Sequence, residues 1–597
     1  MRALSRDRRR RIAIEAALVP LVLLAGEGWA LRWVADDAFI NFRVVDQLAH
    51  GNGPVFNVGE RVEAYTSTLW LGILWVGSAV LGIQIEWLSV VLGLLLSVAG
   101  LAAACAGAAR IARDRGADGL LLPLGALVFA VLPATWEFAT SGLETGLSFA
   151  WLGLSFLVLA RTCIGEATPR RRRLALVAVL LGLGPLVRPD FAIFSVAFVG
   201  VLLAVHGRAF PWRRLGLALV AAALPVLYEL FRMGYFASLV PNTAIAKEAS
   251  GNYWSQGLAY LWDFVGTYWL WLPLAALLTW AWFQWRDDRR VGARRRALVT
   301  AAPIVAGLVH VLFVVKVGGD FMHARMLLPG TFAILMPVAM VTVPMRRVGL
   351  ALAGGVAVWA IVCGLALRVP FSVSDVANQK KVLDERSYYV TLGARRENPV
   401  TLEDYRADPW AQSGLAMRRR AAAGEHVVTF KGPNFDKQDE SLPDTPTRPG
   451  LPVNVVAPSS NVGLFGYAAG TDVWVVDRLG ITDPIAARER LAQRGRVGHE
   501  KVLPALWVAA RFSDPKRLPP VFEQDPGVEL ARQALDCRAW VWDGTGKHLQ
   551  GPLRKLLGEI SQPMSAGRFL ANVSETVSGG KFRLPLDPAA AKVEMCG

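Results

Sequence analysis

Two adjacent carboxylates, Asp36 and Asp37, directly follow the first long apolar segment of the chain. Repulsion between neighbouring acids raises the pKa of one while the other stays ionised, so the pair suits a general base or a nucleophile. It equally suits a divalent cation such as Mg²⁺ or Ca²⁺, which prefers carboxylate oxygens. The alternative is a pair of solvated helix-cap carboxylates. Of the two we favour Asp36 as the catalytic group, with Asp37 orienting a hydroxyl or a cation.

Basic side chains stand at the ends of later apolar segments. His323 and Arg325 precede one of these segments, and Lys247 and Arg188 lie at the ends of others. Arginine makes bidentate contacts to phosphate, and lysine adds a point charge. We therefore expect these four residues to bind the phosphate of a lipid-linked donor. The alternative for each is snorkelling at the membrane interface.

Further polar residues stand at the same ends of the apolar segments. A charge at a membrane boundary is costly unless it is paired or functional. Charges of both signs from many segments therefore predict one shared substrate cavity. The candidate substrate-binding residues are Glu63, Tyr65, Thr66, Glu144, Asp190, Asn242 and Asp320.

The sequence argues against nucleotide and nucleic-acid chemistry. It contains no P-loop and no GxGxxG motif, and we expect no cofactor other than the divalent cation. The net charge of +16 could suggest nucleic acid, but the arginines cluster between apolar runs. That distribution is typical of membrane topology, so we expect no nucleic-acid partner.

The elements that position these residues are membrane spans. The chain is 53% hydrophobic, and its apolar residues fall into runs of membrane-spanning length up to about residue 368. Such a pattern predicts a polytopic α-helical membrane protein with about eleven transmembrane helices. The expected spans are 13–34, 89–109, 118–134, 146–161, 173–187, 191–206, 215–235, 258–284, 297–316, 327–345 and 349–368.

The arginines also predict the orientation of the chain in the plasma membrane. Arg8–Arg11 place the N-terminus in the cytoplasm, because cytoplasmic loops are rich in Arg and Lys. The apolar stretch Thr68–Ile83 must then lie along or dip into the outer face, since a full crossing would carry later arginines outside. The basic loops that stay inside are Arg110–Arg115, Arg170–Arg173, Arg208–Arg214, Arg286–Arg296 and Arg346–Arg347.

The remainder of the chain forms an outer domain in this interpretation. Residues 1–368 are the catalytic membrane domain with a first outer loop at 35–88, and 369–597 are a periplasmic, mixed α/β domain. That domain could bind carbohydrate. Trp410, Trp474 and Trp507 could stack on sugars or belong to its core, and Cys537 and Cys596 could form a disulfide.

Two motifs of the first loop, Asp36–Arg43 and Gly51–Trp70, resemble the first outer loop of the GT-C membrane glycosyltransferases. They are similar in particular to the actinobacterial family of terminal β-(1→2) arabinofuranosyltransferases (AftB). Later segments fit the same family, namely Ser141–Thr145, Arg188–Asp190, Pro241–Thr243 with Lys247, Gly318–Pro329, Val476–Asp483 and Gly498–Lys501.

The resemblance implies a GT-C fold and the transfer of arabinofuranose from decaprenyl-phospho-arabinose to terminal positions of cell-wall arabinan, in arabinogalactan or lipoarabinomannan. It implies an acidic residue of the first loop at the reaction centre, which Asp36 and Asp37 match. Donor and product are both β in this family, so configuration is retained. The alternatives are transfer of another polyprenyl-phosphate sugar, a lipid flippase or transporter, and a non-enzymatic envelope or motility protein.

Overall fold

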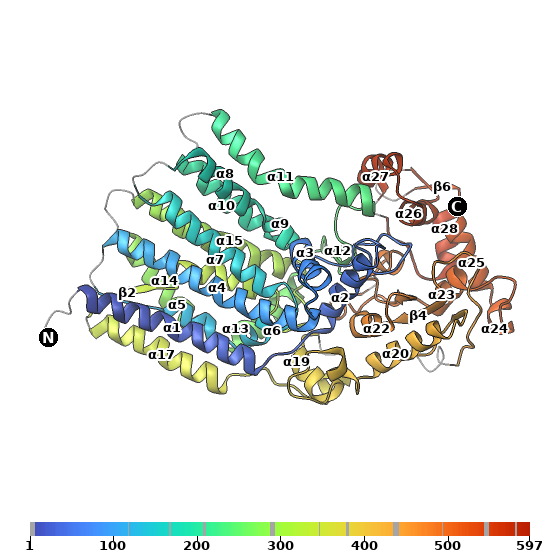
Figure 1. Cartoon of the computed structure of the whole chain (residues 1–597), viewed down its shortest axis with the longest axis horizontal. Coiled ribbons are helices and arrows are strands. Elements are labelled where there is room, and N and C mark those ends of the chain that lie inside the picture. Colours follow the sequence, from blue (N-terminus) through green and yellow to red (C-terminus); the bar gives the residue numbers. More distant parts are fainter. Residues whose placement is uncertain are drawn as a thin grey trace.

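The computed structural model describes residues 6–116, 119–165, 169–206, 211–286, 293–345, 347–377, 381–433, 441–491, 493–542, 548–579 and 582–596. Several basic-loop residues discussed above, namely 207–210, 287–292 and 346, lie outside these ranges. Figure 1 shows long, roughly parallel helices at one end of the molecule and the C-terminal region folded at the other, with the first turn of α1 (Arg6–Ala30) at the far end of the helical bundle.

Seven helices within the described ranges are long and apolar enough to cross a membrane. An eighth span results if α13 (Trp254–Thr267) and α14 (Trp271–Arg286), which meet at a bend of 88°, count as one. The seven are α1 (Arg6–Ala30), α4 (Ile85–Arg115), α7 (Thr145–Cys163), α10 (Ala192–His206) with the turn Pro189–Phe191 before it, α11 (Pro211–Phe236), α15 (Ala293–Lys316) and α17 (Arg347–Ala366).

The expected count of about eleven is therefore not confirmed, because three expected spans are broken. Proline lacks the backbone N–H that a helix interior needs, and a proline stands at a break in each. Pro123 separates β1 (Leu120–Leu122) from α5 (Leu124–Ala130), before α6 (Pro133–Thr140). The other two segments consist of α8 (Arg171–Gly182) with α9 (Gly184–Val187), and of α16 (Leu328–Leu335), the turn Met336–Val338 and β2 (Val341–Val343), which pairs antiparallel with β1.

The stretch Thr68–Ile83 begins and ends at the same end of the bundle. It forms α3 (Thr68–Trp75) and a π-helical turn to Val80, which together are shorter than a span. The next helix, α4, begins beside the end of α1, since a Cβ placed on Gly142 would meet both Val34 and Ser89.

Glycines set the close packing of α4 against α7. A Cβ on Gly146 would lie 2.1 Å from the carbonyl oxygen of Gly93, and one on Gly153 would lie 2.1 Å from that of Gly100. The two glycines of each helix are seven residues apart, so they lie on the same face of that helix. The contact fixes the N-terminal end of α7, where Glu144 stands.

The C-terminal region is a mixed α/β fold. Its parallel sheet has the order β3 (Val427–Val428), β4 (Val455–Ser459) and β5 (Val473–Asp477). Strands β4 and β5 are buried throughout, as expected for a sheet covered on both faces. Cys537 and Cys596 form a disulfide.

The remaining elements of this region are helices, except for one short hairpin. They are α18 (Val373–Ala377), α19 (Glu385–Tyr388), α20 (Pro409–Ala422), α22 (Val462–Ala469), α23 (Ala505–Phe512), α24 (Pro520–Glu523), α25 (Pro526–Asp536), β6 (Trp540–Trp542) with β7 (His548–Gln550), α26 (Pro552–Ser561), α27 (Ala566–Gly579) and α28 (Pro588–Cys596), with short turns at Tyr389–Gly393, Leu402–Tyr405 and Ala486–Arg488.

The three tryptophans proposed to face carbohydrate belong to the core. Trp410 and Trp474 are 4% exposed and Trp507 is 1% exposed, so the prediction that they stack on sugars is wrong. Trp507 also donates its indole N–H to the carbonyl of Leu586 at 2.7 Å. An apolar ring is more stable in the interior, and these rings fill the space around the sheet.

The helix α2 (Asp36–Ala49) joins the bundle to the C-terminal region. The buried Arg43 guanidinium donates to the carbonyls of Phe56, Gly466 and Val473 at 2.6–2.8 Å. One hydrophobic core also runs from the membrane helices through α2 to α20 and α22. The core therefore does not separate at residue 368, where the sequence placed a domain boundary.

Candidate functional site

A cavity of about 210 Å³ lies where α2, α12 (Asn242–Ala246) and the end of α15 meet the loops that precede α7 and α10. The C-terminal region contributes Ile481 and Val497 to its wall. Most of the residues nominated from the sequence line this cavity: Asp37, Tyr65, Thr66, Glu144, Arg188, Asp190, Lys247, Asp320 and Arg325.

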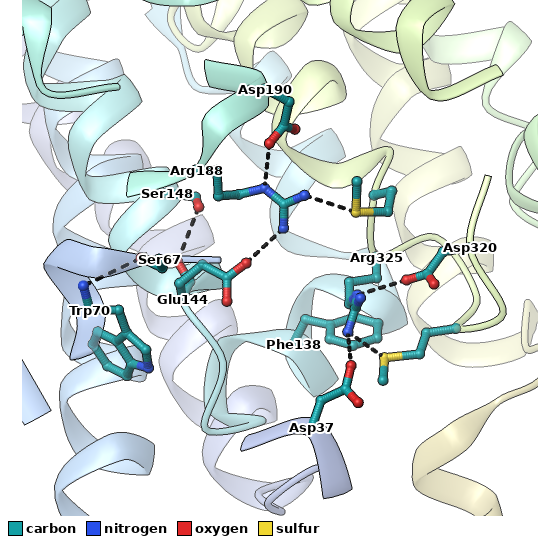
Figure 2. A network of polar contacts seen from close by, with 12 residues as sticks. Asp37, Ser67, Trp70, Phe138, Glu144, Ser148, Arg188, Asp190, Asp320 and Arg325 are labelled. Atoms are coloured by element: carbon teal, nitrogen blue, oxygen red, sulfur yellow. Dashed lines mark hydrogen bonds and ion pairs between the residues drawn. The ribbon is translucent and has the colours of Figure 1, made fainter. Parts of the chain in front are cut away.

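Asp37 is bound to Arg325 in this cavity. The Arg325 Nη1 lies 3.0 Å from Asp37 Oδ2, and its Nε lies 2.8 Å from Asp320 Oδ2, so one guanidinium bridges two carboxylates (Figure 2). Burial by itself raises the pKa of Asp37, but Lys247 and Arg325 together hold that pKa below its ordinary value. Asp37 is therefore an ionised carboxylate at neutral pH.

A second bridged arginine lies beside the first (Figure 2). Arg188 contacts Glu144 at 2.6 Å and Asp190 at 3.0 Å, and Asp190 also accepts a contact from His310 at 2.8 Å. Glu144, Arg188 and Asp190 stand at helix ends, and His310 lies within α15, so the network ties the cavity wall to the bundle. Met326 Sδ lies 3.0 Å from the same guanidinium.

Lys247 is held less tightly than the two arginines. Its Nζ lies 3.7 Å from Asp320 Oδ1, beyond hydrogen-bond distance, and 5.7 Å from the centre of the Phe321 ring. The side chain is 20% exposed. An ammonium with one long contact can turn toward an incoming anion.

Asp36 does not face the cavity. Its carboxylate accepts the backbone N–H groups of Leu464 at 2.7 Å and Gly463 at 3.2 Å, at the N-terminal end of α22. Such a carboxylate offsets the partial positive charge of the helix N-terminus. Burial raises the pKa of Asp36 to about 7 in spite of these bonds. Of the two candidates only Asp37 lines the cavity, whereas the sequence favoured Asp36 as the catalytic group.

Three other nominated residues also lie outside the cavity, each held by partners distant in the sequence. His323 contacts Asp263 at 2.5 Å and Tyr268 at 3.2 Å. Glu63 pairs with Arg232 at 2.6 Å. The Asn242 amide donates to the carbonyls of Gly480, Ile481 and Asp483.

The sequence could not identify the contribution of residues 481–499 to this site. Ile481 and Val497 are ordinary apolar residues, and nothing in their own surroundings in the sequence marks them as cavity wall. The one available signal was the pair of family-like segments, since Ile481 lies inside Val476–Asp483 and Val497 directly precedes Gly498–Lys501.

The divergence of Asp36 and Asp37 bears on the expected divalent cation. One carboxylate binds backbone N–H groups and the other an arginine, so the pair does not converge on a single ion. Within the described part of the chain, no group of three or more His, Cys, Asp or Glu residues is arranged to hold a metal. These donors do not fit the cation site proposed from the sequence, and we derive no step through such an ion.

Comparison with known proteins points to one family. A model of the AftB family C-terminal domain matches residues 450–593. The chain is 32% identical over 637 aligned residues to the terminal β-(1→2)-arabinofuranosyltransferase of Mycobacterium tuberculosis, with 98% of each chain covered. It is 33% identical over 608 residues to the protein of the same name from Corynebacterium glutamicum, covering 95% of this chain and 85% of that one.

Two solved structures are similar at lower identity. ArnT from Cupriavidus metallidurans, bound to undecaprenyl phosphate, is 15% identical with a TM-score of 0.38, over 96% of this chain and 89% of that one. The Archaeoglobus fulgidus oligosaccharyltransferase, in complex with Zn and sulfate, is 13% identical with a TM-score of 0.40, over 90% and 72%.

Proposed function

Because this chain belongs to the family of terminal β-(1→2)-arabinofuranosyltransferases, we propose that its cavity transfers arabinofuranose from decaprenyl-phospho-arabinose to the ends of cell-wall arabinan. The protein is a multi-pass membrane glycosyltransferase. The family supports a polyprenyl-phosphate sugar as donor and a glycan as acceptor. The decaprenyl donor and the arabinan acceptor are our proposal.

Asp37 carries this proposal. It is an ionised carboxylate in a cavity of about 210 Å³, at the end of the bundle that faces the C-terminal region. The sugar of a membrane-anchored donor must lie at that level. Retention of configuration asks for a carboxylate nucleophile or a front-face path, and Asp37 is placed to act on the anomeric carbon in either case. A departing phosphate is a stable anion, so no acid is needed.

The remaining cavity residues support Asp37 in this role. Arg325 keeps the Asp37 carboxylate ionised and fixes its direction through the bridge to Asp320. Tyr65, Thr66 and Glu144 offer hydroxyl and carboxylate groups that suit sugar hydroxyls. The C-terminal residues Ile481 and Val497 close the side that the acceptor must pass.

We further propose that the bundle crosses the plasma membrane with the N-terminus in the cytoplasm and the C-terminal region outside. The N-terminal end of α1 and the C-terminal end of α4, both rich in arginine, lie at the end of the bundle opposite the C-terminal region (Figure 1). Basic residues collect on the cytoplasmic side of membranes. This orientation places the cavity at the outer face.

The test is a transfer assay with purified protein, radiolabelled decaprenyl-phospho-arabinose and a synthetic arabinan acceptor. We expect product from the wild type and from Asp46→Asn, which removes a carboxylate from the same helix outside the cavity, and none from Asp37→Asn. Parallel reactions with other polyprenyl-phosphate sugars identify the donor. If the wild type consumes a different sugar and leaves arabinose untouched, the proposed donor is wrong.

A further inference from the structure

The arginines nominated for the donor phosphate are already neutralised by carboxylates. Arg325 bridges Asp37 and Asp320, and Arg188 bridges Glu144 and Asp190 (Figure 2). A guanidinium with two carboxylate partners offers little uncompensated charge to a third anion. The phosphate therefore needs cations that these carboxylates hold only through a long contact, as Asp320 holds Lys247, or do not contact at all.

Three basic side chains converge on the Phe321 ring. The Lys247 Nζ lies 5.7 Å from the ring centre and the Arg496 guanidinium carbon 4.9 Å, while the His499 ring meets it edge-on at 4.8 Å between centres. Lys247 comes from the segment after α11, whereas Arg496 and His499 come from the C-terminal region. The cluster therefore forms only when the two regions are assembled.

Arg496 has no carboxylate within ion-pair distance among the residues that the structure describes, although Glu385 and Asp320 act on its charge from farther away. Its side chain makes no ion pair there, and its buried Nε has no hydrogen-bond acceptor. A mostly buried guanidinium without a carboxylate is costly, because it loses water without gaining an opposite charge. An anionic ligand that binds to this guanidinium would offset that cost.

The neighbouring contacts hold the turn that carries Arg496 and His499. Arg494 stacks on Tyr253 at 4.2 Å and pairs with Glu500 at 3.0 Å. The other Glu500 oxygen accepts the backbone N–H of Gly498 at 2.8 Å, and a Cβ on Gly498 would lie 3.1 Å from Lys247 Cε. Arg494 therefore already has a carboxylate partner and stabilises the turn. The turn packs directly on Lys247.

We infer that Arg496 and His499 of the C-terminal region, together with Lys247, bind the phosphate of the lipid-linked donor. This inference rests on the proposed function, since it names the site for that donor's phosphate. Val497, between the two residues, lines the cavity that contains Asp37. When the anomeric carbon–oxygen bond breaks, its electron pair leaves on the phosphate oxygen, and the cationic cluster stabilises that anion.

The electrostatics of His499 agree with a positive site. Burial, together with the positive charges of Arg496 and Lys247, lowers the pKa of His499 to about 4, while the Val497 carbonyl and Asp37 act in the opposite direction. A neutral imidazole carries one N–H, which His499 can donate to a phosphate oxygen only by giving up the 3.3 Å contact of its Nδ1 with the Val497 carbonyl. Arg496 and Lys247 supply the charge.

The experiment measures binding of decaprenyl phosphate, which carries the phosphate but no sugar, to full-length protein in detergent. We expect Arg496→Gln to weaken binding by about tenfold to a hundredfold, the range for losing one charge-assisted contact, and His499→Gln by less. Arg490→Gln is the matched control, because Arg490 pairs with Glu594 on the exposed surface of the same region. The affinity of the Arg490→Gln variant for decaprenyl phosphate should equal that of the wild type.

Two further arms keep the result unambiguous. Arg496→Lys retains the charge and should recover part of the affinity, which a merely misfolded protein would not do. Decaprenol without phosphate should not compete, whereas inorganic phosphate should compete only at far higher concentration if the site is built for a lipid phosphate. Competition by inorganic phosphate as strong as by decaprenyl phosphate would overturn the lipid as the source of the anion.

The outcomes separate this inference from the proposed function. Equal affinities for Arg496→Gln and Arg490→Gln overturn the phosphate site, even if the wild type transfers arabinose normally. Conversely, Arg496-dependent binding of decaprenyl phosphate without any arabinose transfer supports the phosphate site and contradicts the proposed sugar.

Discussion

Asp36 and Asp37 are neighbours in the sequence, but their carboxylates bind different parts of the molecule. Asp36 accepts the N–H of Leu464 at 2.7 Å and fastens the C-terminal region to α2, whereas Asp37 pairs with Arg325 at 3.0 Å inside the cavity. One residue joins two regions of the chain, and the next lines the cavity that we propose as the reaction centre. Assembly of the C-terminal region and placement of the Asp37 carboxylate are thereby coupled.

The first prediction separates the two carboxylates by activity. Asp37→Asn keeps the shape of the side chain and removes its charge, so transfer should fall by at least about a hundredfold. Asp36→Asn keeps an acceptor oxygen for Leu464 and should retain transfer within about tenfold. Turnover is measured with purified variants of matched thermal stability. The reverse order of activities would restore Asp36 as the catalytic group.

The second prediction concerns pH and stability. The pKa of Asp36 is about 7 in the folded protein, above its ordinary value of 3.8, so folding favours the protonated form. The unfolded chain binds fewer protons than the folded one between these values, and stability must fall as pH rises through that range. The melting temperature of the wild type relative to Asp36→Asn should therefore decline from about pH 4 to pH 7. A constant difference would contradict the assignment.

The third prediction compares two basic residues that the sequence treated alike. Lys247 lines the cavity with one long contact, while His323 lies outside it against Asp263 and Tyr268. Lys247→Ala should raise the KM for donor about tenfold to a hundredfold, and His323→Ala should leave that KM nearly unchanged. Steady-state kinetics at saturating acceptor measure both. An equal rise in the KM for donor in the two variants would indicate that His323 also binds the phosphate.

The fourth prediction assigns Asn242 to assembly. Its amide donates to three carbonyls of the C-terminal region, so Asn242→Ala leaves buried acceptors unpaired and should cost about 1–3 kcal/mol. A lower melting temperature with an unchanged KM for both substrates is expected. The half-exposed Asn52, whose side chain donates to Gln47 within α2, provides the control substitution to Ala. A raised KM at unchanged stability would instead indicate a substrate contact.

The fifth prediction tests the orientation in the membrane. Single cysteines at His50 and Ile83 flank α3, and both side chains are exposed. Both should react with an impermeant thiol reagent applied from outside, and a cysteine at Arg172 should not. The native Cys105, Cys163 and Cys363 are buried and should remain silent. Protection of the cysteine at position 83 would show that Thr68–Ile83 crosses the membrane.

The sequence by itself determined the features that depend on local composition. Long apolar runs specify spans because each must bury its backbone and side chains in hydrocarbon, and α1, α4, α7, α15 and α17 lie where such runs predicted them. The first-loop motif also identified the family correctly. Composition did not reveal which runs are broken, because prolines stand both at a break, as Pro123 does before α5, and inside the unbroken helices α1, α11 and α15.

Only the tertiary structure decided which side chains meet. Adjacent residues on a helix point about 100° apart, so Asp36 and Asp37 leave α2 in different directions, and the direction of α2 decides which of them enters the cavity. Arg325 and Asp37 are separated by 288 positions, and no local pattern could pair them. The same holds for Arg496, which reaches Phe321 because Asp36, Arg43 and Asn242 bind the C-terminal region to the bundle through contacts between distant segments.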